Sequence, residues 1–104
     1  MLRVYEEVIR VVREMRDVLE AVERRDADLG RQIRRAVSSV ALNIAEANGM
    51  RGGNRRLRFA SALGSMRETL AGLEVARAFG YVDVGPEVPA QIDRICAALY
   101  SLAR

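Results

Sequence analysis

The sequence predicts an all-α fold, an antiparallel up-down-up-down left-handed four-helix bundle formed by one domain that spans residues 1–104. Four segments repeat apolar residues at alternating spacings of three and four, which places those residues on one face of a helix. The connections between the segments are short, so consecutive helices are expected to be antiparallel neighbours. The expected helices cover about residues 2–24, 28–48, 54–79 and 86–103.

The first expected helix has an apolar surface wider than one seam requires. Val4, Val11 and Val18 form a second stripe, with Ile9 on the other flank. This width indicates either contact with a second subunit or a helix sunk deeper into its own bundle, and the periodicity favours neither. The heptad seam itself consists of Tyr5, Val8, Val12, Met15, Leu19 and Val22.

The second expected helix is preceded by two candidate N-caps. The carboxylate of Asp26 or Asp28 can accept hydrogen bonds from the free N–H groups of its first turn. The helix is expected to continue to Asn48 or Gly49. Its apolar ridge consists of Ile33, Val37, Val40 and Ile44.

The third and fourth expected helices are delimited by residues typical of helix ends. Asn54 is the expected N-cap of the third helix, and Gly80 is the expected left-handed residue after its C-terminus. Pro86 suits the first turn of the fourth helix. Gly64 lies in mid-helix, where glycine costs about 1 kcal/mol relative to alanine. Close contact with the second helix is expected to offset that cost.

Three blocks of residues together form a recognisable pattern. The first block is Gln32 to Ala36 with Ser39 and Asn43 to Glu46; the second is Phe59, Ala62 to Ser65 and Glu68; the third is Gly80 to Val82. This pattern resembles the four helix bundle protein family, also called the 23S rRNA intervening-sequence protein (S23-like) family. The resemblance implies a homo-oligomer, and specifically a ring-like homopentamer with a positively charged surface. The similar accessory variability protein of diversity-generating retroelements works with a reverse transcriptase and RNA, and some members are encoded inside 23S rRNA intervening sequences.

The composition argues against an enzyme. The chain has no histidine and a single cysteine, Cys96, which lies on an apolar helix face. A nucleophile paired with a base, a zinc site and the Glu-x-x-His pairs of a di-iron bundle are therefore not expected, and neither is a cofactor. The sequence has no apolar run long enough to span a membrane, and its first ten residues, which include acids, are not expected to act as a signal peptide. With one cysteine, this predicts a cytoplasmic protein.

Positive charge is concentrated in the middle of the chain. Residues 29–79 contain nine Arg and three Glu, a net charge of +6, whereas the chain as a whole carries +3. Arginines beside a helix N-terminus and a glycine-rich turn suit a phosphate. Two patches are expected at opposite ends of the second helix, roughly 30 Å apart. The candidate nucleic-acid or anion-binding residues are Arg31, Arg34, Arg35, Arg51, Arg55, Arg56 and Arg58.

A set of polar residues lies close to the buried faces of the second and third helices. It is expected to form a structural hydrogen-bonded network, with a recognition site for a ligand or partner as the alternative. The set consists of Gln32, Ser39, Asn43, Glu46, Ser65 and Glu68.

Two functions follow from these patterns. The first is a non-enzymatic oligomer that binds nucleic acid, RNA by preference, through its arginines. No aromatic residue interleaves them except Phe59, so the contacts would be mainly to the backbone and weakly sequence-specific. The alternative is a protein-interaction scaffold whose arginines make subunit or partner contacts.

Overall fold

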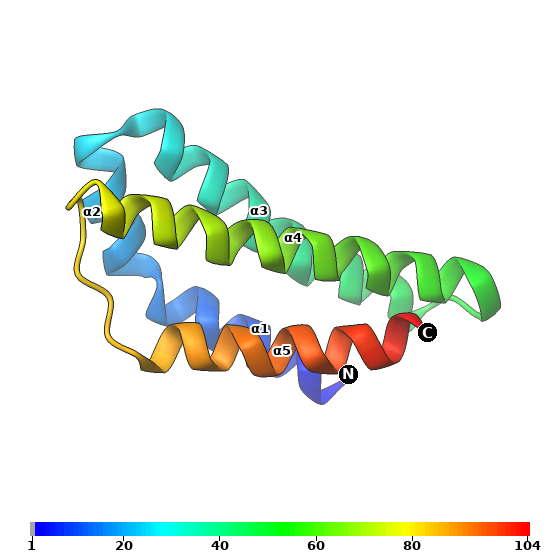
Figure 1. Cartoon of the computed structure of the whole chain (residues 1–104). Helices are drawn as coiled ribbons and strands as arrows, with labels where there is room; N and C mark the ends of the chain where they lie inside the picture. The colour runs from blue at the N-terminus through cyan, green and yellow to red at the C-terminus, as the bar shows by residue number, and fades with distance from the viewer. Residues whose placement is uncertain (1) are drawn as a thin grey trace.

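A computed structural model describes residues 2–104 and shows an all-α chain, as predicted (Figure 1). No strand is present in this range. The molecule is elongated, with principal extents of 42 × 24 × 19 Å. None of the described helices is both long enough and apolar enough to cross a membrane. The helices are α1 (Arg3–Glu14), α2 (Arg16–Arg25), α3 (Ala27–Asn48), α4 (Gly52–Ala78) and α5 (Glu87–Ala103).

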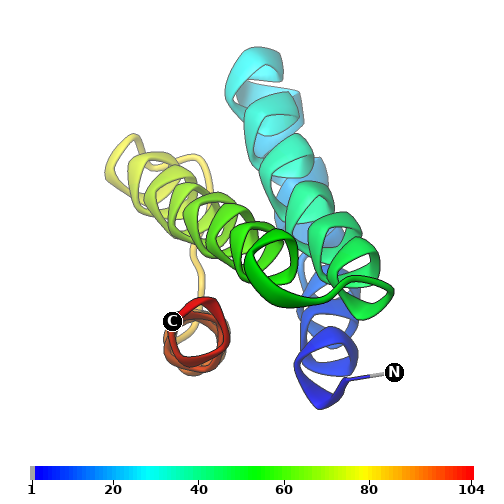
Figure 2. The same ribbon diagram turned by 90° about the vertical axis from the view of Figure 1, so that its right-hand side faces the viewer.

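The helices run back and forth along the long axis of the molecule. α1 and α2 lead away from the N-terminus, α3 returns, α4 reverses again, and α5 runs beside α1 (Figure 1). Seen along the axis, α3 and α4 lie on one side and α1 and α5 on the other (Figure 2). α3 contacts α1, α2 and α4, while α5 contacts α1 and α4. This arrangement leaves one side of the α3–α4 pair uncovered.

The predicted first helix is divided at Met15. Met15 has backbone angles φ −84° and ψ −4°, and its N–H still donates to the Val11 carbonyl at 2.9 Å. The break shifts the buried face: Val4 and Val11 are buried within the same chain, whereas Tyr5 and Val12 are only half-buried. The predicted seam therefore holds at Val8, Met15, Leu19 and Val22, whereas Tyr5 and Val12 pack only against the edge of the core. In the second stripe, the chain's own helices bury Val4 and Val11 but leave Val18 and the flanking Ile9 half-buried.

The connection between α2 and α3 follows the sequence prediction. Asp26 is the N-cap of α3, and its Oδ1 accepts a hydrogen bond from the Leu29 N–H at 3.0 Å. Gly30 faces Glu23 of α2 so closely that an added Cβ would lie 3.0 Å from the Glu23 Cα. The two helices can therefore meet here only because residue 30 has no side chain.

The end of α4 is a Schellman motif. Gly80 has φ +75°, its N–H donates to the Arg77 carbonyl at 2.9 Å, and the Tyr81 N–H donates to the Ala76 carbonyl at 3.0 Å. The prediction of a left-handed Gly80 is confirmed. Tyr81 then stacks on Phe79, with 5.1 Å between ring centroids. Pro86 occupies the N-cap position of α5, one residue before the helix begins.

Two predictions about α4 were wrong. The helix begins at Gly52, so Asn54 lies inside its first turn, and the N-cap Arg51 makes no side-chain capping bond. Gly64 is exposed, and an added Cβ there would meet nothing within 4 Å. The close approach of α3 and α4 occurs at Gly72 instead, where an added Cβ would lie 2.5 Å from the Ile33 Cγ1. Helical rotation places Gly64 on the uncovered side.

Candidate nucleic-acid interface

A shallow groove follows the uncovered side of the α3–α4 pair. α3 contributes side chains one turn apart, at positions 35, 38, 42 and 46, and α4 contributes Arg58 from the facing helix. Leu42 is 66% exposed in this groove. The lining residues are Arg34, Arg35, Ser38, Ser39, Leu42, Asn43, Glu46 and Arg58.

The floor of the groove is held by a chain of hydrogen bonds between α3 and α4. The Ser39 and Ser65 hydroxyls lie 2.9 Å apart. The Asn43 amide donates to the Ser39 carbonyl at 2.9 Å and to the Ser39 hydroxyl at 3.1 Å. Arg58 donates to the Asn43 amide oxygen at 3.4 Å and pairs with Glu46 at 3.0 Å. Four of the six predicted network residues are therefore joined: Ser39, Asn43, Glu46 and Ser65. Arg58, which the sequence predicted as a nucleic-acid-binding residue, links Glu46 to the other three.

The other two predicted network residues lie elsewhere. Gln32 and Glu68 are exposed and line a second hollow farther along the α3–α4 seam, beside Gly72. Neither makes a side-chain hydrogen bond to the Ser39–Ser65 pair within the described structure. Both residues are close in sequence to buried residues of their helices, but their side chains lie at the exposed edge of the α3–α4 contact.

The seven predicted arginines divide into two groups by their partners. Arg31 pairs with Asp28, and Arg34 forms a two-pronged pair with Glu23 at 2.7 and 3.1 Å. Arg55 donates to the Ala47 carbonyl at 2.9 Å and lies over the Phe59 ring, so it closes the C-terminal end of α3. Arg58 belongs to the groove network described above. Three have neither an ion pair nor a hydrogen bond within residues 2–104: Arg35, Arg51 and Arg56.

The expectation of two separate patches holds only in part. Arg58 follows the α3–α4 turn in sequence, yet it lines the same groove as Arg34 and Arg35. The reason is the antiparallel hairpin: α4 runs back along α3, so Arg58 faces the last two turns of α3. Arg51, Arg55 and Arg56 remain at the turn itself.

The Glu23–Arg34 ion pair is held by two hydrogen bonds. The hydrogen bond and charge of Arg34 lower the pKa of the Glu23 carboxyl, and Glu23 in turn raises the pKa of Arg34. The pair joins α2 to α3 beside Gly30. It removes Arg34 from the set of freely available cations while leaving half of its side chain exposed.

Glu23→Gln is therefore expected to weaken the fold in a pH-dependent way. The folded-state pKa of Glu23 is lowered, so its stabilising contribution is present above the ordinary pKa of glutamate and is lost as the pH falls through the lowered value. Urea denaturation of both proteins at neutral and acidic pH measures this. The difference in free energy of unfolding should be largest at neutral pH and vanish in acid. A difference that does not change with pH would contradict this account.

Sequence reasoning missed two groove residues and one structural role. Ser38 and Leu42 were not singled out, although they follow Arg35 at spacings of three and seven on one helical face. The capping role of Arg55 had no local signal, because the carbonyl that it binds lies eight residues earlier. Burial raises the pKa of the half-buried Cys96 thiol, a direction unfavourable to a thiolate nucleophile.

The family model described as 23S rRNA-intervening sequence protein matches residues 1–101. No curated protein and no solved structure matches the chain. The match covers all five helices up to the last turn of α5.

Proposed function

Because the chain belongs to the 23S rRNA-intervening sequence protein family, we propose that it is a non-enzymatic, RNA-binding protein of the cytoplasm. In this proposal its subunit is an antiparallel four-helix bundle, and the subunits assemble into a homo-oligomer. The RNA backbone binds along the α3–α4 groove and the turn that joins these helices. The observation that carries the proposal is the set of arginines on this surface that lack a partner within residues 2–104.

The chemistry of the groove supports backbone recognition. Guanidinium groups, hydroxyls and side-chain amides are the usual donors to phosphate oxygens. The groove offers the unpaired Arg35, and Arg51 and Arg56 extend the positive charge around the turn. The Ser38 hydroxyl already donates to the Arg34 carbonyl and the Asn43 amide already donates to Ser39, so these two side chains shape the groove. Arg55 is occupied by the Ala47 carbonyl, so it belongs to the scaffold of the site.

The test compares two triple variants that remove the same charge. Replacing Arg35, Arg51 and Arg56 by Ala is expected to weaken binding of a generic single-stranded RNA by about tenfold or more. The slope of log K against log salt should fall by about 2, because each lost phosphate contact contributes about 0.7. Fluorescence anisotropy over a salt series measures both quantities.

The matched control replaces three exposed arginines of α1 and α2 by Ala. Arg3, Arg13 and Arg16 have no ion pair or hydrogen bond within residues 2–104, and they lie outside the groove. This control lowers the net charge by the same amount as the groove variant. Because its three arginines lie outside the groove, it should leave most of the RNA affinity and of the salt slope in place. Equal losses in the two variants would mean that net charge alone attracts RNA, and no loss in either would exclude the groove.

The homo-oligomer is supported by an apolar side chain on the exposed face of α4. Leu57 is 65% exposed and lies outside the arginine groove. On α4, Leu57, Gly64 and Ala71 follow one another at seven-residue spacing, so they lie on one exposed face. Such a face has small residues where a second helix can approach closely.

Replacing Leu57 by Gln is therefore expected to dissociate the assembly while leaving the subunit folded. This side chain is largely exposed within the chain, so its loss should change subunit stability by no more than about 0.5 kcal/mol. Sedimentation velocity gives the mass, and circular dichroism gives the helicity. A variant that keeps the mass of the parent protein would place the subunit contact elsewhere.

The exposed Leu57 also favours the alternative function, a scaffold for another protein. The discriminating result is the behaviour of the Arg35, Arg51 and Arg56 triple variant. Loss of RNA binding with an unchanged assembly supports the RNA proposal. Dissociation of the assembly by the arginine variant would show that the arginines make subunit contacts.

A further inference from the structure

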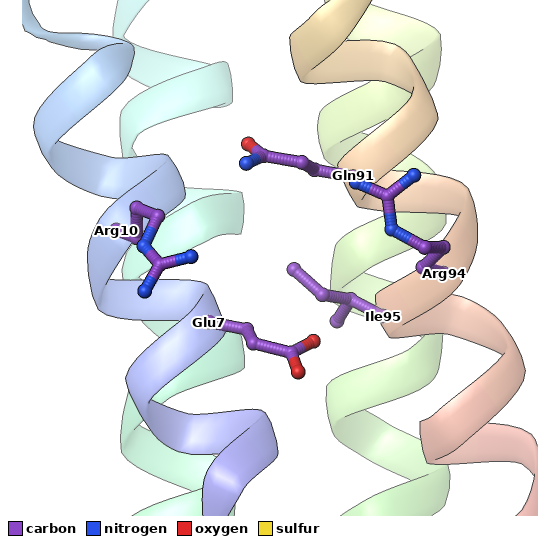
Figure 3. Close-up of a pocket in the computed structure, with 5 residues that line it drawn as sticks. All are labelled: Glu7, Arg10, Gln91, Arg94 and Ile95. Carbon is purple, nitrogen blue, oxygen red and sulfur yellow. The ribbon is translucent and has the colours of Figure 1, made fainter.

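A small hollow lies between α1 and α5, on the opposite side of the molecule from the arginine groove. Its walls are Glu7 and Arg10 from α1 and Gln91, Arg94 and Ile95 from α5 (Figure 3). Its volume is about 170 Å³. An engineered cavity of roughly 150 Å³ holds benzene, so this hollow has room for one small molecule.

The side chain of Gln91 has an unsatisfied hydrogen-bond acceptor at the wall of this hollow. Its Oε1 is buried and has no hydrogen-bond partner in the described structure. Figure 3 shows the Gln91 amide extending from α5 toward α1, into the space between the helices. A buried acceptor left without a donor is destabilising, so a guest that offers an N–H group would be favoured here.

Three charged groups surround the same space. The Arg10 guanidinium and the Glu7 carboxylate both point from α1 toward α5, and Arg94 lies on α5 beside Gln91 (Figure 3). None of the three forms an ion pair within residues 2–104. Two guanidinium groups and one carboxylate give the hollow a net charge of +1. A complementary guest carries −1 overall and includes a cationic or N–H donor for Glu7 and Gln91.

We propose that this hollow binds a small amino dicarboxylate, a molecule of the chemical class of aspartate. Its two carboxylates pair with Arg10 and Arg94. Its ammonium group faces Glu7 and donates to the Gln91 Oε1 once the Gln91 amide turns from its buried position into the hollow. Ile95 supplies the apolar wall against the carbon chain. A plain dicarboxylate lacks the donor that Gln91 requires and brings extra negative charge toward Glu7, so it fits less well.

The bound molecule would connect α1 to α5. These helices come from opposite ends of the chain, and the hollow lies on the seam where they meet (Figure 3). A ligand that binds only the folded chain raises its apparent stability by mass action. The melting temperature is therefore expected to rise with L-aspartate concentration, and this readout does not depend on RNA.

The experiment titrates the isotopically labelled full chain with L-aspartate and, separately, with succinate, which lacks the ammonium group. Saturable shifts of backbone amide resonances in α1 and α5 are expected with L-aspartate, and succinate should bind about tenfold more weakly. Gln91→Leu should weaken L-aspartate binding by about tenfold. Arg13→Ala, an exposed α1 residue outside the hollow, should bind like the parent protein.

A second variant tests the role assigned to the carboxylate. Glu7→Gln should reduce the preference for L-aspartate over succinate, because the carboxylate that faces the ammonium group is lost. The absence of saturable shifts at millimolar L-aspartate would overturn the proposal. Gln91→Leu that binds L-aspartate as well as the parent protein would also overturn it, since the unmet acceptor would then have no part in binding.

Discussion

Phe59→Ala is expected to lower the free energy of unfolding by about 3–5 kcal/mol, the range for truncating a buried phenylalanine. Phe59 is fully buried at the start of α4, where it packs in the core beneath the α3–α4 turn. The Arg55 guanidinium lies 5.0 Å from the centre of its ring and at the same time donates to the Ala47 carbonyl. The truncation therefore leaves a cavity and removes the support of Arg55.

Chemical denaturation measures this loss, with Leu57→Ala as the control. Leu57 is two residues earlier on the same helix but is 65% exposed, so its truncation should cost the subunit no more than about 0.5 kcal/mol. The comparison is made at a protein concentration at which any assembly is dissociated. Equal losses at the two positions would show that the core does not extend to this turn.

Gly72→Ala is expected to destabilise the chain by about 1–3 kcal/mol, although alanine is the better helix former. The new Cβ would lie 2.5 Å from the Ile33 Cγ1 and 3.2 Å from its Cδ1, and Ile33 is 1% exposed. Either Ile33 leaves its rotamer or α3 moves away from α4. The cost arises from overpacking, so it should appear in the free energy of unfolding with no loss of helicity.

Gly64→Ala is the matched control, because it makes the same change in the same helix. An added Cβ meets nothing there, so the dissociated subunit should gain about 0.4–1 kcal/mol. A double-mutant cycle then tests the cause at Gly72. In an Ile33→Ala background, Gly72→Ala should lose most of its cost. If the cost persists without the Ile33 side chain, the contact with Ile33 is not its origin.

The elements that local sequence predicted well are those in which one residue decides the geometry. Asp26 caps α3 because its own carboxylate reaches the N–H three residues later. Gly80 ends α4 because only glycine adopts a left-handed conformation at little cost. α3 ends at Asn48, as the sequence predicted, before the glycine-rich turn. The helices themselves follow from apolar spacing, since a stripe at that period must be buried.

The candidate site was predicted less completely, because it depends on which side of each helix is covered. The seven arginines were identified as a charge concentration, but the sequence does not show that Glu23 binds Arg34 or that Ala47 binds Arg55. These partners lie eight and eleven residues away and come into range only when the helices pack. The same holds for Ser39 and Ser65, which are 26 residues apart and meet across the α3–α4 seam.

The sequence by itself determined the helical class of this protein, the approximate bounds of its long helical segments and the concentration of positive charge between residues 29 and 79. These features depend on residues within one or two turns of one another, where geometry is fixed by the helix itself. Only the tertiary structure decided that Gly72 rather than Gly64 admits the neighbouring helix, and that Arg35, Arg51 and Arg56 keep their charges unpaired within residues 2–104. The rotation of each helix about its axis sets those facts, and that rotation results from packing all the helices together.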